Sequence, residues 1–274
     1  MAQAIGTSGL TRYFEDFCAV KGVELAVESG AIYGFLGPNG AGKSTTIKML
    51  TGILAPTSGS ISVLGLNPWN PTESLKIKRR IGVVPEGLAL FDHLTAREYL
   101  TFVGRMFLLP PSMIEQRSEE LLALLRLTGV EKKLTLEYSH GMKKKLALAG
   151  ALLPNPDLLF LDEPFEGVDA VTSRTIRDLL ANFARRGSTV FVTSHVLEIV
   201  DRICSHVGII AHGELVEQSS LAELRRDTSL EQRFLEIVGS SSEEDQHLSW
   251  LEDARQDNTL ESEENHHEEP MSND

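Results

Sequence analysis

A glycine-rich segment that ends in a lysine and two hydroxyl residues is the most chemically specific feature of this 274-residue chain. Residues 37–45 match the pattern GxxxxGK[ST], in which small residues let backbone N–H groups surround phosphate oxygens. We expect the ammonium of Lys43 to bridge the β- and γ-phosphates of a nucleotide, and the hydroxyl of Ser44 to bind Mg²⁺. The residues predicted to line this phosphate site are Gly37, Pro38, Asn39, Gly40, Ala41, Gly42, Lys43, Ser44 and Thr45.

Two adjacent acids follow an apolar run farther along the chain, where residues 158–163 read LLFLDE. If this run is a strand, Asp162 lies at the carboxyl edge of a sheet, where open α/β sheets bind ligands. Asp162 would then hold Mg²⁺ through water, and Glu163 would be the general base that activates the attacking water. Taken alone, two acids after a strand are equally well explained as solvated side chains. Combined with the phosphate site, they predict nucleotide hydrolysis.

These residues need a sheet to position them, and four short apolar runs bounded by glycine or proline predict its strands. The runs are residues 31–36, 158–161, 189–193 and 207–211. Continuous apolar character is typical of strands that are buried on both faces of a parallel sheet, and helical patterns alternate with them. The predicted fold class is therefore α/β, with a P-loop NTPase core and a mostly parallel sheet.

The pattern changes between about residues 86 and 153, where helical periodicity replaces the apolar runs. Thr95 and Glu98 have the spacing of a capping box, which predicts a helix over residues 98–108. A second amphipathic helix is predicted over residues 118–127. We interpret this stretch as a helical subdomain that is inserted into the sheet domain.

Residues 1–239 are expected to form one domain that ends in two short helices between about residues 220 and 238. The residues predicted to form a docking face on the last helix are Leu230, Phe234, Leu235 and Val238. The segment 240–274 carries 12 of the 39 acidic side chains and a single basic one, so it holds −11 of the net charge of −13. We expect this acidic tail to be mostly disordered, because it has too little apolar surface to offset the ordering entropy.

Composition excludes several classes of protein. No apolar run approaches the ~20 residues of a membrane-spanning helix, and the first ten residues lack the basic and apolar segments of a secretory signal. Outside the acidic tail the chain is nearly neutral, so it offers no basic field for nucleic acid. Cys18 and Cys204 lack metal-ligand spacing and are expected to be reduced thiols of a cytoplasmic protein. Any role at a membrane must therefore come through a partner.

Three further motifs point to a family. Residues 138–143 (YSHGMK) open an apolar helix and resemble the ABC signature. Val168-Asp169 resembles the D-loop, and His195, directly after the run 189–193, resembles the switch histidine. Because these motifs occur in the family's order around the phosphate site, residues 5–238 resemble an ABC ATPase.

The resemblance implies ATP and Mg²⁺ as cofactors, ATPase activity and an N-terminal antiparallel β subdomain. Two chains, identical or different, would meet head to tail, so that each ATP lies between the P-loop of one chain and the signature of the other. Ser139 and the N–H of Gly141 would bind the γ-phosphate at a helix N-terminus. Asp169 would organise the contact between the chains, and His195 would contact the γ-phosphate. The implied catalytic residues are Glu163, His195 and Lys43.

An aromatic side chain is expected to stack on the adenine ring, again from the resemblance. Alignment back from Ala19-Val20 favours Phe14, with Tyr13 as the alternative. Both residues precede the P-loop, as the family's order requires.

The chain departs from the common family pattern at three positions. His140 and Met142 stand in the signature where glycine and glutamine are commonest, and Glu86 replaces the Q-loop glutamine. A carboxylate can offer an oxygen to Mg²⁺, but it cannot donate a hydrogen bond when ionised. Glu86 is expected either to reach the nucleotide and the metal or to face solvent.

The form of the signature and of residues 234–239 resembles cassettes that serve separately encoded exporter permeases for drugs, lipids, peptides or polysaccharide. The implied protein is a peripheral subunit on the inner face of the cell membrane, bound to an integral-membrane permease. Residues 87–94 would edge the groove that receives the permease, with Phe91 and Leu94 as apolar anchors. The alternative is a non-transport ABC ATPase of DNA or ribosomes, against which the single cassette without a long coiled coil argues.

Overall fold

The computed structural model describes residues 3–88 and 90–239. The described residues up to Val238 belong to one compact unit. The predicted acidic tail at 240–274 lies outside the described residues. None of the described helices is long and apolar enough to cross a membrane.

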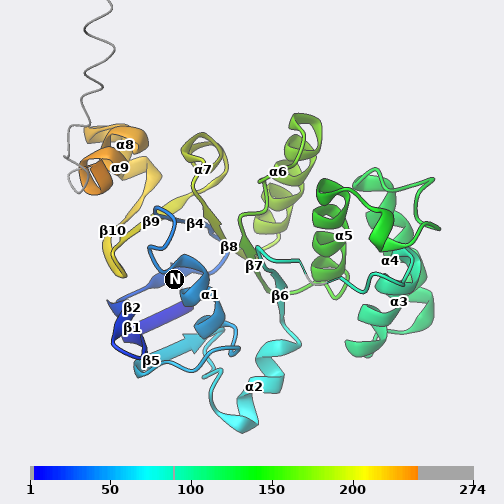
Figure 1. The fold of residues 1–274 in the computed structure, drawn as a ribbon, viewed down its shortest axis with the longest axis horizontal. Coiled ribbons are helices and arrows are strands. Elements are labelled where there is room, and N and C mark those ends of the chain that lie inside the picture. The colour runs from blue at the N-terminus through cyan, green and yellow to red at the C-terminus, as the bar shows by residue number, and fades with distance from the viewer. Residues whose placement is uncertain (1–2, 89, 240–274) are drawn as a thin grey trace, which may run out of the picture. The chain divides into compact units, whose positions relative to one another are not determined.

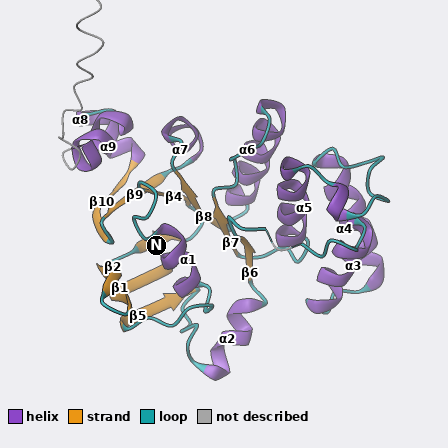
Figure 2. Ribbon diagram, viewed as in Figure 1, coloured by secondary structure: helices purple, strands orange, loops and turns teal. Residues whose placement is uncertain are grey.

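A six-stranded sheet forms the centre of the first unit, in the order β10-β9-β4-β8-β7-β6 (Figures 1 and 2). Of the strands described, β10 runs antiparallel to β9 and the other pairs are parallel. Strands β4, β7 and β8 are buried along their whole length, as their apolar sequences predict. The strands are β4 (Ile32–Leu36), β6 (Ile81–Val84), β7 (Leu158–Asp162), β8 (Thr189–Ser194), β9 (His206–Ala211) and β10 (Glu214–Ser220). The α/β fold class with a mostly parallel sheet is confirmed.

The register of this sheet places the predicted site residues at one edge. Leu36 of β4 pairs with Ser194 of β8, while Asp162 of β7 lies opposite Thr193 of β8. Because these three parallel strands end at the same level, the segments that follow them leave the sheet side by side. Those segments hold the P-loop and the candidate catalytic residues.

A smaller antiparallel sheet packs beside the P-loop, with three strands before it in the chain and one after it, as the family resemblance implies. Its long strand β1 (Gln3–Phe14) pairs with β2 (Phe17–Val23), β3 (Ala26–Glu28) and β5 (Ser58–Val63). Helix α1 (Lys43–Leu50) shares one apolar core with both sheets. In that core, Phe191 of β8 stacks on Tyr33 of β4 at 5.5 Å between ring centroids. The P-loop is thus held between two packed layers. Helix α2 (Pro71–Lys78) follows β5.

Helices occupy the stretch between β6 and β7. They are α3 (Ala96–Met106), α4 (Pro111–Leu124), the 3₁₀ turn η1 (Thr135–Glu137) and α5 (His140–Leu152). The predicted capping box forms, because Thr95 Oγ1 accepts from the Glu98 N–H and Glu98 Oε2 accepts from the Thr95 N–H. The second predicted helix begins earlier than residue 118: proline suits the first helical position, and α4 starts at Pro111.

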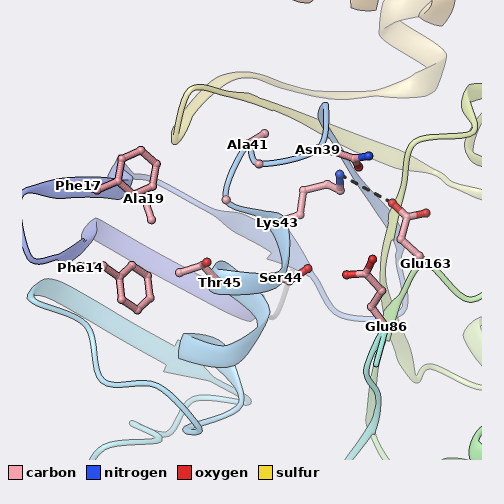
Figure 3. Close-up of a pocket in the computed structure, with 12 residues that line it drawn as sticks. Phe14, Phe17, Ala19, Asn39, Ala41, Lys43, Ser44, Thr45, Glu86 and Glu163 are labelled. Carbon is pink, nitrogen blue, oxygen red and sulfur yellow. Dashed lines mark ion pairs between the residues drawn. The ribbon is translucent and has the colours of Figure 1, made fainter. Parts of the chain in front are cut away.

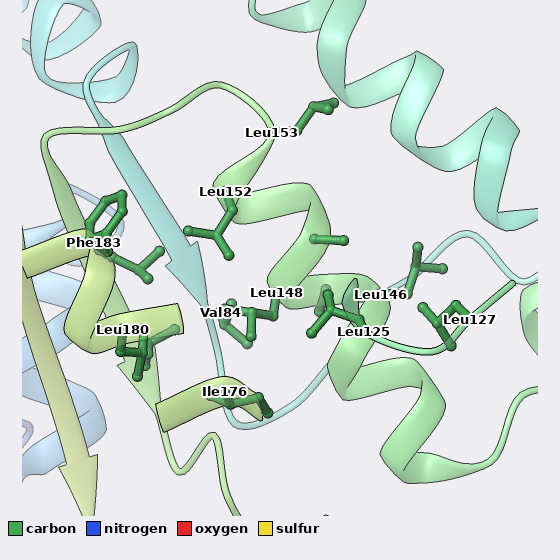
Figure 4. Packing of buried hydrophobic residues seen from close by; sticks show 14 of the residues in the cluster. Val84, Leu125, Leu127, Leu146, Leu148, Leu152, Leu153, Ile176, Leu180 and Phe183 are labelled. Atoms are coloured by element: carbon green, nitrogen blue, oxygen red, sulfur yellow. The ribbon is translucent and has the colours of Figure 1, made fainter. Parts of the chain in front are cut away.

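Helix α5 packs its apolar face between β6 and α6 (Ala170–Arg185), as Figure 4 shows. Leu148 and Leu152 of α5 lie near Val84, Ile176 and Leu180 in this core. Close packing on this scale fixes the axis of α5 relative to the sheet.

The C-terminal helices of the unit pack on the sheet edge with α7 (Leu197–Ile203). They are α8 (Leu221–Asp227) and α9 (Leu230–Gly239). The predicted docking face on α9 is partly wrong: Leu230 is buried and Phe234 and Ile237 pack against its cluster, but Leu235 is 58% exposed. An α-helix completes one turn every 3.6 residues, so a residue two turns after Leu230 lies on the same face. Ile237 therefore shares the buried face with Leu230, and Leu235 does not.

The two cysteines lie in different surroundings. Cys204 follows α7 and packs over Gly34 of β4, and burial raises the pKa of its thiol. Cys18 is partly exposed in β2, and its Sγ donates to the carbonyl of Val20. Both are free thiols.

An apolar groove of about 430 Å³ is lined by residues of β6, α3, α5 and the segment after α1. Ile53, Leu88 and Leu90 contribute to its walls. The predicted anchors Phe91 and Leu94 are not among its lining residues; the ring of Phe91 instead packs edge-to-face on Phe102 at 5.0 Å. Of residues 87–94, Leu88 and Leu90 line this groove, whereas Phe91 lies outside it and is 51% exposed.

Candidate nucleotide site

The carboxyl edge of the sheet opens into a pocket of about 350 Å³ (Figure 3). Residues 39–45 of the P-loop line it together with Phe14, Glu86 and Glu163. In Figure 3 the aromatic rings stand at one end of the P-loop and the two carboxylates at the other. The pocket thus offers apolar faces at one end and charged groups at the other.

The P-loop adopts a shape that only small residues permit. A Cβ atom on Gly37 would lie 2.3 Å from the carbonyl oxygen of Ile210, and Gly42 has a left-handed φ of 105°. Lys43 is buried, and its Nζ donates to the carbonyls of Gly37 at 2.8 Å and Pro38 at 3.2 Å. Helix α1 begins at Lys43, so its first N–H groups have no helical partner and can bind an anion.

Glu163 lies at the charged end of the pocket and contacts the side chains of Lys43 and His195. It is buried after β7 in a left-handed conformation with φ 49°. Its Oε2 lies 3.0 Å from Nδ1 of His195, and its Oε1 lies 3.8 Å from Nζ of Lys43. Oε1 has no hydrogen-bond partner among the described residues. Of the two carboxylate oxygens, only the one that faces His195 is therefore hydrogen-bonded within the described part of the chain.

The hydroxyl of Thr193 hydrogen-bonds to both adjacent acidic residues, Asp162 and Glu163. Thr193 Oγ1 donates to Oδ1 of Asp162 at 2.5 Å and accepts from the backbone N–H of Glu163 at 3.1 Å. Asp162 is buried and does not line the pocket. Sequence patterns gave no indication of this role for Thr193.

The oxygen donors of the pocket fit a Mg²⁺ ion that shares its ligands with phosphates. The Ser44 hydroxyl and the carboxylates of Glu86 and Glu163 line the same cavity, and Figure 3 shows the Glu86 carboxylate on the Ser44 side of Glu163. Within the described part of the chain, no group of three or more His, Cys, Asp or Glu residues is arranged to hold a metal alone. Mg²⁺ in nucleotide sites uses few protein ligands, so this donor set suits it.

Two aromatic rings, Phe14 and Phe17, lie at the apolar end of the pocket, and the sequence predicted only Phe14. Phe14 lines the pocket, but the alternative Tyr13 does not. Phe17 lines it as well and pairs with Phe14 across the β1–β2 turn. The guanidinium of Arg12 lies 4.7 Å from the centre of the Phe14 ring and supports one face of it. The hairpin pairing is the signal that would have identified Phe17.

The remaining predicted site residues do not line this pocket. Ser139 caps α5 by accepting from the Met142 N–H at 3.3 Å, and Gly141 lies in the first turn of that helix. Asp169 caps α6, where hydrogen bonds from the side chain and backbone of Thr172 hold the pKa of its carboxyl below the usual value. The structure therefore gathers the P-loop and acid groups but leaves the signature and D-loop residues outside their own chain's pocket.

The chain is similar in sequence to known ABC transporter ATP-binding proteins. A family model described as ABC transporter matches residues 20–166. An uncharacterised ABC transporter ATP-binding protein of Nostoc is 39% identical over 75% of this chain and 61% of its own length. The bacitracin transport ATP-binding protein of Bacillus licheniformis is 38% identical over 82% of this chain and 72% of its own length. The chain thus spans about three fifths of the Nostoc relative.

A solved structure supports the fold in three dimensions. It is a dimeric bacterial ABC transporter cassette, 26% identical, with a TM-score of 0.73 over 79% of this chain and 98% of the other.

Proposed function

Because the chain belongs to the ABC transporter family of ATP-binding proteins, we propose that it binds ATP in the pocket at the P-loop and hydrolyses it. The observation that carries this proposal is the position of Glu163. Its carboxylate lies 3.8 Å from the Lys43 ammonium and 3.0 Å from the His195 ring. Stacking of adenine on Phe14 fits the aromatic end of the same cavity.

The proposed chemistry follows from these positions. Glu163 accepts a proton from water as that water attacks the γ-phosphate, which is general-base catalysis. Lys43 and the free N–H groups at the start of α1 stabilise the phosphate charge. His195 holds Oε2 of Glu163, so that Oε1 faces the site.

Mg²⁺ is the cofactor that the oxygen donors favour. Ser44 would bind it directly, Asp162 through water, and Glu86 with its carboxylate. The ion would neutralise negative charge on the β- and γ-phosphates. Glu86 lines the pocket although it is an exposed residue, which supports the reading in which it reaches the nucleotide.

A second ATPase chain, identical or different, is the first proposed partner. Ser139, Gly141 and Asp169 do not line their own chain's pocket, yet Ser139 and Gly141 form a helix N-terminus suited to an anion. Head-to-tail pairing of two chains would bring that N-terminus to the γ-phosphate of the other chain. Two ATP molecules would then be enclosed between the chains.

Nucleotide-dependent pairing can be measured directly. The Glu163→Gln protein with ATP and Mg²⁺ is expected to show about twice the monomer mass in light scattering, because bound ATP adds charge-assisted contacts from both chains. The same protein with ADP, which lacks the γ-phosphate, serves as the control and should remain monomeric. A monomer under the ATP condition would contradict the pairing.

An integral-membrane permease is the second proposed partner, with the chain on the cytoplasmic face of the membrane and export as the direction. The apolar groove that contains Ile53 and Leu90 suits an apolar helix from such a partner. Relatives named for bacitracin transport and for linearmycin and daunorubicin/doxorubicin resistance favour an exporter.

Ile53→Asp tests this docking. Ile53 is 68% exposed, so the change should leave folding and basal ATPase activity intact while abolishing stimulation by the co-expressed permease in vesicles. Leu75→Asp is the matched control, because Leu75 is similarly exposed on α2 but outside the groove. Undiminished permease stimulation in Ile53→Asp would remove the groove from consideration.

A further inference from the structure

The second turn of α5 contains a buried lysine that the proposed chemistry does not use. The Lys144 side chain is 3% exposed, and its Nζ donates to the backbone carbonyl of Glu163 at 2.8 Å. It also contacts Oε2 of Glu166 at 3.3 Å. Burying an ammonium is unfavourable unless it is hydrogen-bonded and paired, so these two contacts explain why it is tolerated there.

The carbonyl that Lys144 holds belongs to a residue with an uncommon backbone conformation. Glu163 has φ 49°, a value that residues other than glycine adopt rarely and at a cost. Its N–H donates to Thr193 Oγ1 and its C=O accepts from Lys144, so both peptide groups that flank its Cα are fixed by side chains. The direction of the Glu163 side chain toward Lys43 and His195 therefore depends on these two contacts.

The first turn of α5 touches the same loop. A Cβ atom on Gly167 would lie 3.0 Å from the ring of His140, and one on Gly141 would lie 3.2 Å from the carbonyl oxygen of Gly167. The start of α5 thus packs against the segment that follows Glu163, and Lys144, one turn later, binds Glu163 itself. The signature end of α5 and the catalytic loop form one packed unit.

We propose that Lys144 is a positioning residue that fixes the Glu163 backbone and thereby ties the signature helix to the general base of its own chain. The inference rests on the proposed ATPase function, because it concerns the base of that reaction. Lys144 does not line the nucleotide pocket, so it should affect turnover and not the binding of ATP.

Steady-state kinetics of Lys144→Met test the proposal. We expect kcat to fall by about 10²-fold, the effect of a small displacement of a catalytic group, with KM for ATP essentially unchanged. Lys144→Arg keeps a cationic N–H donor and should recover part of the loss. A KM that rises in parallel with the loss of kcat, or an Arg variant no better than Met, would assign Lys144 a merely structural role and overturn the proposal.

A matched control comes from the opposite end of the same helix. Arg117 of α4 donates to the carbonyl of Leu153, just after α5, at 2.8 Å. Arg117→Met therefore also removes a cation that holds a backbone carbonyl at α5, but far from Glu163 along the helix. Its kcat should stay at the wild-type value, and an equal loss in both variants would contradict the inference.

A double substitution separates positioning from other effects. In single-turnover measurements on Glu163→Gln, adding Lys144→Met should cause no further loss, because the base that Lys144 positions is already gone. A further loss as large as in the wild-type background would overturn the proposal. If the wild-type chain itself fails to hydrolyse ATP, the proposed function fails, which is a distinct result from normal turnover in Lys144→Met.

Discussion

Replacing Glu163 with glutamine is expected to lower ATP hydrolysis by about 10²–10⁴-fold, the usual share of general-base catalysis, while leaving ATP binding intact. Glutamine keeps the volume of the side chain, but it removes the oxygen that lies 3.8 Å from Lys43 as a proton acceptor. Lys43, Ser44 and the P-loop backbone still hold the phosphates. Phosphate release at saturating ATP measures the loss, and equilibrium binding of a fluorescent ATP analogue checks that affinity survives.

Glu86 makes this experiment more informative. Because its carboxylate lines the same pocket, it can partly replace the missing base in Glu163→Gln. Residual turnover in the single variant should then disappear in the double variant with Glu86→Gln. Equal residual rates in the single and double variants would show that Glu86 takes no part, and wild-type rates in each single variant would require another base.

Lys43→Ala is expected to weaken ATP binding by about 10²-fold and to remove turnover, because charge-assisted hydrogen bonds to the phosphates are lost. Lys43 is the cation at the centre of the P-loop, with its Nζ already held by two backbone carbonyls. That preorganisation reduces the entropy cost of binding the phosphates. Isothermal titration with ATP and Mg²⁺ measures the affinity directly.

Lys48→Ala is the control for that variant. Lys48 is an exposed residue of the same helix α1, so its loss changes the net charge equally without touching the pocket. Affinity should remain within about twofold of the wild type, as for a surface substitution away from the site. Unchanged ATP binding in Lys43→Ala would refute the assignment of the phosphate site.

The parts of the fold that could be predicted from sequence are those governed by local pattern. Strands β4, β7 and β8 are mostly apolar because both faces are buried, and the capping box at Thr95 marks the start of α3. The antiparallel sheet followed only from the family resemblance. Its strand β5 is exposed at four of six positions, so burial leaves no clear alternation to read.

The same distinction applies to the site. The P-loop is a contiguous segment, and its residue types determine its chemistry wherever it folds. Phe17, Thr193 and Lys144 acquire their roles only through tertiary contacts. Lys144 is the middle one of three consecutive lysines, and nothing in their sequence shows which of the three turns inward toward the carbonyl of Glu163.

The two cysteines lie in different surroundings, so a thiol-reactive dye can distinguish between them. Thiolate is the form that reacts with alkylating dyes, and burial beneath α7 suppresses it at Cys204. Cys18 stands between Phe17 and Ala19, both of which line the nucleotide pocket. A maleimide fluorophore should therefore attach preferentially at Cys18, on the strand that lines the nucleotide pocket. Its emission would follow nucleotide exchange in real time without any engineered label site.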